Sequence, residues 1–371
     1  MQITEIETFP IEPRWLVLAI RTDEGITGYG EPTLEGHLES VQGALEEFER
    51  YLKGKDPRRI EKHWQTLYRG GFYRGGPVLT TALSGVEQAL WDIKGKKLGV
   101  PVYELLGGPC RDKIEVYAHV HGDRTQDYID GALEKVERDF RAFKTTLAGP
   151  ARSLETPQFL QEAVDKVGAI REALGPEVQI GVDLHGRYSP AAAIQAAQSL
   201  EKYNPAFIEE PCLPGDVDSL ARIQSATAIP VATGERLYTK WGFRSVIEKG
   251  AADVLQPDLS HAGGILEGKK IGAMAEARYA SLAPHCPLGP VALAACIQLD
   301  ACTPNFLIQE QVTLGERYLE EPFSVENGFI PLPEDPGLGI EVNEDALREG
   351  LLEEPWQTPS WTHEDGSVAD W

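Results

Sequence analysis

The first hundred residues carry two hydrophobic patterns. Apolar and polar residues partly alternate over 3–11 and over 15–29, which predicts the strands of a small sheet. From residue 38 the apolar positions recur every three or four residues as far as 52, which predicts an amphipathic helix. The same spacing predicts further helices over 59–68 and 78–97. We therefore expect an α+β arrangement for this part of the chain.

After Pro109 the pattern changes to short apolar runs separated by stretches with helical spacing. Eight such runs are present, over residues 116–120, 142–146, 178–184, 206–210, 229–233, 253–256, 280–283 and 306–309. Buried parallel strands consist of nearly uninterrupted apolar residues. A (β/α)8 barrel requires eight such strands alternating with helices. The sequence therefore predicts an α/β fold with a modified (β/α)8 TIM-type barrel.

Gly- and Pro-rich sequence ends this repeat from about Leu314 onward. Such sequence is typical of turns and loops, so we expect the tail to pack back on the first domain. The expected domains are an α+β region over 1–112, the barrel over 113–315 and a C-terminal segment over 316–371.

Polar residues close six of the apolar runs. They are Asp183, Glu209, Glu235, Asp258, His285 and Glu310, which follow one another at intervals of 26, 26, 23, 27 and 25 residues. Each interval has the length of one strand-helix unit. The C-terminal ends of strands in a closed parallel barrel converge on one mouth, where barrel enzymes carry their active sites. We therefore expect all six side chains in one cavity.

Three of the six are carboxylates on successive units: Asp183, Glu209 and Glu235. Clustered carboxylates repel one another, so such a group normally needs a cation. Donor sets made only of oxygen suit Mg²⁺ or Mn²⁺ rather than zinc. The sequence therefore predicts a site for one of these ions.

Two histidines are expected beside the carboxylates. Strand alternation points residues 183 and 185 to the same side, so His185 should face the metal site. His285 lies one unit after Asp258, so these two side chains can pair. An anionic partner would orient the imidazole and raise its basicity.

Composition narrows the function classes. The formal charge is −23, from 58 acidic and 35 basic residues, which argues against nucleic-acid binding because phosphates must be met by clustered Lys and Arg. The sequence lacks an apolar run of the roughly 20 residues that a membrane span needs, and also a basic, signal-like start. Five scattered cysteines without a C-x-x-C pair fit a reducing cytoplasm.

Longer motifs surround these residues. They include Gly71-Phe72-Tyr73-Arg74-Gly75-Gly76-Pro77, Asp183-Leu184-His185-Gly186-Arg187, Phe207-Ile208-Glu209-Glu210-Pro211, Gly234-Glu235-Arg236, Gln256-Pro257-Asp258-Leu259-Ser260-His261-Ala262-Gly263-Gly264 and Ala283-Pro284-His285-Cys286-Pro287. In these motifs, and along nearly its whole length, the chain resembles the enolase superfamily, in its mandelate racemase and muconate-lactonizing subgroup.

The resemblance implies a capping domain, made from the N-terminal region and the C-terminal tail, that closes over the barrel mouth. It implies that Asp183, Glu209 and Glu235 bind Mg²⁺, and that His285 is the base, assisted by Asp258. It further implies that His185 is the acid and that Glu310 steadies the intermediate. We expect Glu310 to share the developing charge if its acidic surroundings raise its pKa.

The activity implied is Mg²⁺-dependent dehydration of a sugar acid. The expected substrate is D-galactonate, converted to 2-dehydro-3-deoxy-D-galactonate, with gluconate, xylonate and arabonate as alternatives. Racemases of this subgroup carry a Lys-x-Lys pair on the second barrel strand, whereas this chain has Lys144-Thr145-Thr146. The missing second lysine favours elimination over racemization. A racemase and a non-catalytic metal-binding relative remain alternatives.

Further side chains are candidates for substrate contact. They are Arg14, Trp15, Tyr73, Arg74, His121 and Lys144. His119 could also touch substrate, and Lys144 could instead be structural or solvated. The tail tryptophans, Trp356, Trp361 and Trp371, are expected to anchor the tail or to form an interface rather than to bind ligand. By the same resemblance, we expect a homo-oligomer.

Overall fold

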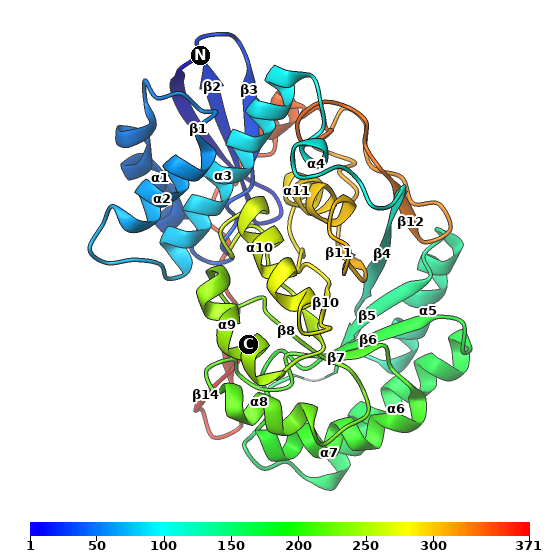
Figure 1. Cartoon of the computed structure of the whole chain (residues 1–371). Coiled ribbons are helices and arrows are strands. Elements are labelled where there is room, and N and C mark those ends of the chain that lie inside the picture. Colours follow the sequence, from blue (N-terminus) through cyan, green and yellow to red (C-terminus); the bar gives the residue numbers. More distant parts are fainter. Residues whose placement is uncertain (148) are drawn as a thin grey trace.

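A computed structural model describes residues 1–147 and 149–371 of the chain. Three antiparallel strands begin it, in the order β1 (Ile3–Ile11), β2 (Trp15–Thr22) and β3 (Thr27–Gly30). Four helices follow, α1 (Leu38–Leu52), α2 (Ile60–Arg69), α3 (Pro77–Leu98) and α4 (Val102–Leu105). Figure 1 shows this region in blue and cyan at one side of the barrel. The three longer helices were predicted to within one residue at each end.

Helix α3 is the centre of this region. All of its residues from Thr80 to Ile93 are buried, because β3 packs on one side and α1 and α2 pack on others. The contact with β3 depends on glycine at the crossing. A Cβ atom on Gly30 would lie 2.0 Å from the carbonyl oxygen of Gly85, so any larger residue would force the strand away from the helix.

The barrel strands alternate with helices in chain order. They are β4 (Lys113–Val120), α5 (Thr125–Glu137), β5 (Ala142–Thr146), α6 (Pro157–Leu174), β6 (Gln179–Asp183), α7 (Pro190–Leu200), the 3₁₀ turn Glu201–Tyr203, β7 (Phe207–Glu209), α8 (Val217–Gln224), β8 (Val231–Thr233), α9 (Thr239–Lys249), β9 (Val254–Leu255), α10 (Ile265–Glu276), β10 (Ser281–Leu282), α11 (Pro290–Ala301) and β11 (Gln309–Gln311). The barrel prediction is confirmed. The eighth strand lies about two residues later than the apolar run 306–309 suggested.

All eight barrel strands run parallel, in the order β10-β9-β8-β7-β6-β5-β4-β11. The ring closes where Leu282 of β10 forms a parallel bridge with Phe306, just before β11. The amide of Leu307 also donates to the carbonyl of Leu282 at 2.7 Å. Closure brings the C-terminal ends of all eight strands to the same mouth.

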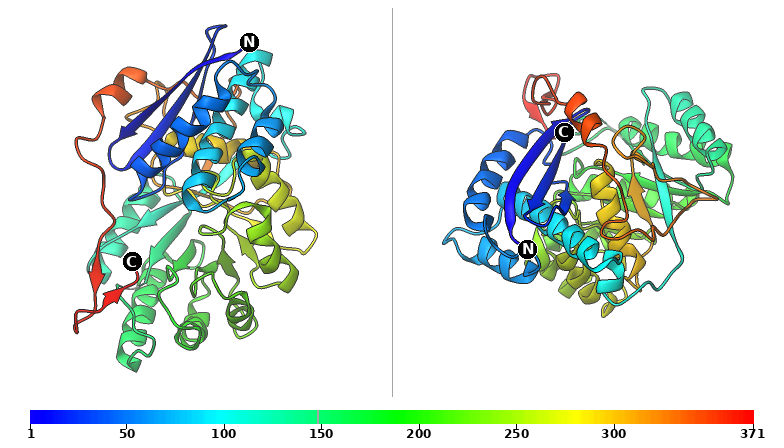
Figure 2. Two further views of the ribbon diagram at one scale, coloured as in Figure 1. Left: turned by 90° about the vertical axis from the view of Figure 1, so that its left-hand side faces the viewer. Right: turned by 90° about the horizontal axis from the view of Figure 1, so that it is seen from above.

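The last 60 residues contact both the barrel and the first region. Strand β12 (Phe329–Pro331) pairs antiparallel with β4, and α12 (Glu344–Glu349) contacts β1. Glu344 accepts from Arg21 at 2.9 and 3.0 Å and from the Tyr29 hydroxyl at 2.6 Å. The chain then continues to a small hairpin, β13 (Trp361–Thr362) and β14 (Val368–Ala369), against the barrel. Figure 2 shows this path in orange and red.

Two buried glutamates fix the first region on the barrel. Glu87 of α3 accepts from the amides of Ile265 and Leu266 at the start of α10. Glu31, just after β3, accepts from the amides of Gly289 and Ala292 at the start of α11. Burial raises the pKa of each carboxyl to about 7, although helix N-termini favour an anion. These contacts set the first region beside the barrel mouth.

Within the described residues, no helix has both the length and the apolar character that crossing a membrane requires.

Candidate active site

The six predicted residues stand at corresponding places on neighbouring strands. Asp183 ends β6 and Glu209 ends β7, and these two residues are paired in the parallel register. Glu235, Asp258 and His285 come two or three residues after β8, β9 and β10, and Glu310 lies within β11. The six residues therefore meet at one mouth. Asp183, Glu235 and His285 line the cavity described below, whereas Glu209, Asp258 and Glu310 are buried and do not line it.

The three predicted ligands form a compact cluster. One oxygen each from Asp183, Glu209 and Glu235 lies within 4.8 Å of the others. Lys144 of β5 enters the same cluster. Its Nζ is 2.6 Å from Glu209 Oε1, 2.6 Å from Glu310 Oε1 and 3.5 Å from Asp183 Oδ2. Lys144 is thus buried among carboxylates and not solvated.

The cluster has more buried carboxylates than positive charges to balance them. Burial, with Asp183 nearby, raises the pKa of Glu209 to about 8, and burial also raises the pKa of Glu235 to about 8. Although burial opposes the charged form, Glu209 and Glu310 hold the pKa of Lys144 well above its usual value. One ammonium therefore does not offset this many buried carboxylates. A divalent cation bound by the three oxygens would replace the protons that the glutamates otherwise retain, so the residues fit such an ion.

His285 makes the predicted pair with Asp258. Its Nδ1 donates to Asp258 Oδ2 at 2.8 Å, so its Nε2 is the nitrogen available for proton transfer. This Nε2 lies 3.5 Å from Glu235 and 3.8 Å from Glu310. Burial disfavours the imidazolium, but the charges of Glu310, Glu235 and Asp258 raise the pKa of His285 well above its usual value.

His261 is a second partner of Asp258 that the sequence analysis did not identify. Its Nδ1 is 3.4 Å from Asp258 Oδ2, and its Nε2 donates to the carbonyl oxygen of Thr33 at 2.8 Å. Thr33 belongs to the loop after β3. His261 therefore joins the N-terminal region to the pair formed by Asp258 and His285.

His185 lies beside Asp183, although the reason given by strand alternation is wrong. Strand β6 ends at Asp183, and the chain turns at once, with φ of 51° at His185 and 70° at Gly186. This turn places His185 Nε2 2.9 Å from Asp183 Oδ2. Arg187 Nη2 donates to His185 Nδ1 at 2.7 Å. Since guanidinium groups only donate, the ring proton is on Nε2.

Glu310 does not have the raised pKa that its acidic surroundings suggested. Burial would raise it, but Lys144, His285 and His119 hold the pKa of Glu310 well below its usual value. His119 Nε2 lies 2.5 Å from Glu310 Oε1, and the amide of Cys286 donates to Oε2 at 2.7 Å. The sequence predicts Lys144 as a substrate contact or a structural lysine, but it does not predict the pairing of Lys144 with Glu310.

A cavity of about 550 Å³ opens above the cluster, and we call it the carboxylate cavity. Of the predicted site residues, its lining includes His121, Lys144, Asp183, His185, Glu235 and His285. Arg14 also lines it, in an ion pair with Glu35 at 2.6 Å. Burial, with His119 nearby, lowers the pKa of His121 to about 4.

Three predicted substrate contacts lie outside this cavity. Trp15 is buried and lines a different cavity, together with Glu12 and Tyr318. Tyr73 is 86% exposed, and Arg74 beside it is also exposed. Contact of these side chains with substrate stays a prediction.

Other side chains that were not predicted also line the carboxylate cavity. They are Leu34, Glu35, His37, Arg236, Tyr238, His261, Pro287, Val312, Thr358 and Trp371. Arg236 directly follows Glu235 and pairs with the buried Glu210 at 2.5 Å. That adjacency was a usable signal, since a charged residue next to a metal ligand is commonly part of its surroundings. Thr358 and Trp371 gave no such signal, and Trp371 lines this cavity although the tail tryptophans are expected to anchor the tail or to form an interface.

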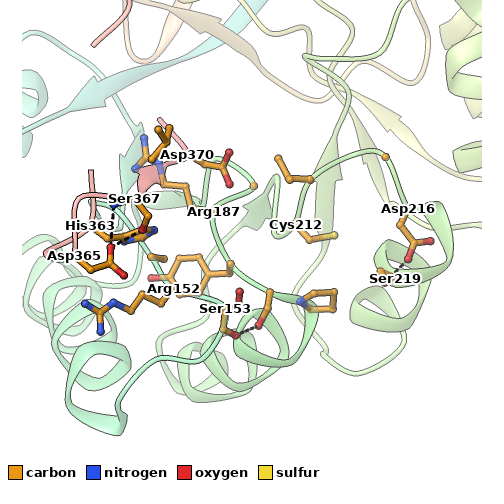
Figure 3. A pocket seen from close by; sticks show the side chains of 18 residues that line it. Arg152, Ser153, Arg187, Cys212, Asp216, Ser219, His363, Asp365, Ser367 and Asp370 are labelled. Carbon is orange, nitrogen blue, oxygen red and sulfur yellow. Dashed lines mark hydrogen bonds between the residues drawn. The ribbon is translucent and has the colours of Figure 1, made fainter. Parts of the chain in front are cut away.

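A larger cavity of about 810 Å³ lies outside this site. It is formed by the loops after β5, β6 and β7 and by the hairpin of β13 and β14. Figure 3 shows Arg152, Arg187, Asp216 and Asp370 around it. Among the described residues, it shares no lining side chain with the carboxylate cavity. The larger of these two cavities is therefore not the one that contains the predicted catalytic side chains.

Comparisons with known proteins agree with this architecture. Residues 127–346 match the family described as enolase C-terminal domain-like. Residues 8–107 match the N-terminal domain of mandelate racemase / muconate lactonizing enzyme. The chain belongs to the enolase superfamily, in the mandelate racemase and muconate-lactonizing group. Members of this superfamily use a divalent metal ion, and the acidic cluster found here could bind one.

Individual relatives cover the whole chain. It is 47% identical to the D-galactonate dehydratase of Ralstonia pickettii and 46% identical to that of Variovorax paradoxus, each over 100% of both chains. A solved enolase of Agrobacterium radiobacter with bound sodium and L-malate superposes with a TM-score of 0.93 at 30% identity, over 100% of both chains. An enolase-superfamily member from Salmonella Typhimurium gives a TM-score of 0.89 at 31% identity, over 94% of this chain and 98% of the other.

Proposed function

We propose that this protein is a hydro-lyase that dehydrates D-galactonate to 2-dehydro-3-deoxy-D-galactonate. The observation that carries the proposal is the 46–47% identity, over the full length of both chains, to proteins named D-galactonate dehydratase. The site supports it, since Asp183 and Glu235, two of the three proposed metal ligands, line one cavity together with His185 and His285, which follow different strands.

The proposed metal is Mg²⁺, with Mn²⁺ as a substitute, because all three ligands offer oxygen. Asp183, Glu209 and Glu235 would hold it. When bound, the ion supplies positive charge that stabilises the negative charge developing on the substrate carboxylate. Lys144 adds a fixed positive charge in the same cluster.

His285 removes the C2 proton through Nε2, which requires a neutral ring. The charges of Glu310, Glu235 and Asp258 otherwise keep it protonated, and a cation held by Glu235 would offset part of that charge. The other nitrogen of His285 is fixed by Asp258, which keeps the ring oriented and stabilises the imidazolium that forms. Breaking the C2–H bond leaves its electron pair on the substrate, conjugated with the carboxylate. Because the pKa of Glu310 is held well below its usual value, its proposed role is to hold Lys144 and the protonated His285 in place.

His185 then gives a proton to the C3 hydroxyl. The C3–O bond breaks, water leaves, and the enol product tautomerises to the 2-keto-3-deoxy acid. A ring whose Nδ1 accepts from Arg187 is a poor acid at Nε2. Proton delivery therefore requires Arg187 to release Nδ1, so that this nitrogen can be protonated when the site is loaded.

Elimination is favoured over racemization by the second barrel strand. Lys144 of that strand is engaged with Glu209 and Glu310, and the next inward position, Thr146, lines the cavity with a hydroxyl group. A threonine hydroxyl does not act as a base near neutral pH. Racemization needs a base on each face of C2, so this strand lacks the second one.

A panel of aldonates tests the function. The protein with Mg²⁺ should form a 2-keto-3-deoxy acid from D-galactonate with the highest kcat/KM among galactonate, gluconate, xylonate and arabonate. Formation of no 2-keto-3-deoxy acid from any of them would refute a dehydratase. A higher kcat/KM for another aldonate would refute only the substrate. Proton NMR in D₂O would reveal a racemase by deuterium at C2 of unchanged substrate.

We also propose that residues 1–112 and 316–371 form a capping domain over the barrel of residues 113–315. The ion pairs between Arg21 and Glu344 support this grouping. A cytoplasmic homo-oligomer is proposed as the working form, and light scattering after gel filtration tests the oligomeric state.

A further inference from the structure

Residues 353–371, which we call the C-terminal strap, reach the carboxylate cavity. The strap leaves the N-terminal region after α12, runs along the outside of the molecule and turns back at the hairpin of β13 and β14, as Figure 2 shows in red. Two of its side chains, Thr358 and Trp371, line the same cavity as Asp183, His185 and His285. A segment far from the barrel strands in sequence thus forms part of this wall.

The strap is attached to the N-terminal region by close contacts. The Arg14 guanidinium lies 5.3 Å from the centre of the Trp356 ring, and the Trp356 and Trp371 rings are 5.9 Å apart. Gly36, with φ of 76°, sits directly against the strap, since a Cβ there would lie 2.1 Å from Thr358 Oγ1. The aromatic rings and the cation hold this part of the strap at the cavity edge.

The strap is attached to the barrel beside the proposed acid. The Arg187 guanidinium lies 4.5 Å from the centre of the Trp361 ring, and the same guanidinium contacts His185 Nδ1. Figure 3 labels Arg187 and the hairpin residues His363, Asp365 and Asp370 in the lining of the larger cavity. Attachment at both ends gives Trp371 a defined place in the wall.

The proposed position of C1 to C3 leaves part of the cavity for the rest of the substrate, and the strap lines that part. If C1 to C3 of an aldonate lie among Asp183, Glu235, His185 and His285, then the rest of the carbon chain must extend toward the remaining walls. Those walls carry Arg14, Glu35, His37, Thr358 and Trp371. An indole face packs well against C–H groups of a polyol, and a threonine hydroxyl can pair with a sugar hydroxyl.

We infer that Thr358 and Trp371 form a subsite for the C4–C6 polyol end of the aldonate, so that the C-terminal strap is a determinant of substrate chain length. The inference deepens the proposed function and rests on it. Contacts made equally in the ground and transition states change KM rather than kcat.

Substitutions in the strap test the subsite with two substrates. D-galactonate has six carbons, whereas L-threonate has four and the same C2 and C3 configuration. Trp371→Ala should raise KM for D-galactonate about tenfold and change kcat less than threefold, and Trp371→Phe should restore most of the loss. Thr358→Val should raise KM about threefold. Val368→Ala, an 83% exposed residue of the same hairpin, is the matched control and should leave both constants unchanged.

A binding measurement separates recognition from chemistry. In a His285→Asn background with Mg²⁺, calorimetry should give a Kd for D-galactonate about tenfold weaker when Trp371→Ala is added, with the Kd for L-threonate changed less than threefold. Equal weakening for both acids, or no weakening for either, would refute the subsite. If the wild-type protein converts no aldonate, the proposed function fails. If it converts D-galactonate and Trp371→Ala is indistinguishable from it, only the subsite fails. Matching melting temperatures show that each variant is folded.

Discussion

The bottom of the carboxylate cavity and its rim are built from different parts of the chain. The bottom consists of Asp183, Glu209 and Glu235, which stand at or just after the ends of successive strands. Asp183 and Glu209 are paired in register. The rim combines Arg14 of the N-terminal region with Trp371 of the C-terminal strap, more than 350 residues apart. The bottom is therefore fixed by the sheet, whereas the rim depends on contacts between distant segments.

This difference suggests a division of work. A rigid hydrogen-bonded barrel can hold reacting groups to the tolerance that proton transfer needs. Segments held by side-chain packing can vary in sequence and change which substrate fits without disturbing that geometry. Changes at the bottom should then reduce kcat or metal binding, while changes at the rim should raise KM.

The largest effect is expected at the proposed base. His285→Asn removes the group proposed to take the C2 proton and should lower kcat about 10³- to 10⁴-fold. The rate at which the 2-keto-3-deoxy acid forms, measured in samples quenched at set times, gives this loss. The control His363→Asn changes a histidine outside the carboxylate cavity and should be silent. Residual turnover within tenfold of wild type would overturn the assignment of the base.

Loss of a proposed metal ligand should act on metal binding first. Glu209→Gln keeps the shape of the side chain but removes one of the three anionic ligands, so the Kd for Mg²⁺ should weaken by about 100-fold. Calorimetric titration with Mg²⁺ gives this constant without any substrate. Glu320→Gln, at an exposed position, is the matched control. An unchanged Kd in Glu209→Gln would place the ion elsewhere.

A rim substitution should have a smaller effect and a different signature. Arg14→Leu breaks the ion pair with Glu35 and the contact with Trp356, so KM for D-galactonate should rise about three- to tenfold while kcat stays within threefold. Steady-state kinetics decide the matter. A fall in kcat with unchanged KM would mean that the rim takes part in the chemistry, and that bottom and rim do not differ in function.

The smallest effect is a dependence of metal stabilisation on pH. The pKa values of Glu209 and Glu235 are raised to about 8, whereas both carboxyls are ionised at lower pH in the unfolded chain. The metal-free fold therefore loses stability progressively as pH rises from about 4.5 to about 8, and the loss is complete above that pH. Mg²⁺ relieves that repulsion and binds without displacing protons at high pH. The increase in Tm on adding Mg²⁺ should be a few degrees larger at pH 8.5 than at pH 6.5, as measured by calorimetry. An equal increase would contradict the raised pKa values.

The sequence alone determined the barrel and the bottom of its site. Periodic apolar runs fix which residues become strands, and a regular interval places the polar residues that end those strands at one mouth, because parallel strands in a closed barrel share one direction. For that reason the cluster of Asp183, Glu209 and Glu235 and the pairing of His285 with Asp258 could be predicted before any coordinates were known.

Only the tertiary structure decided how those residues are supported. Lys144 reverses the expected pKa of Glu310, a turn with positive φ rather than strand alternation brings His185 to Asp183, and Arg187 sets its tautomer. The fold also decides that His261 donates to Thr33 and that Trp371 lines the cavity. Such contacts join segments far apart in the chain, and no local pattern records them, because they depend on how whole regions pack against one another.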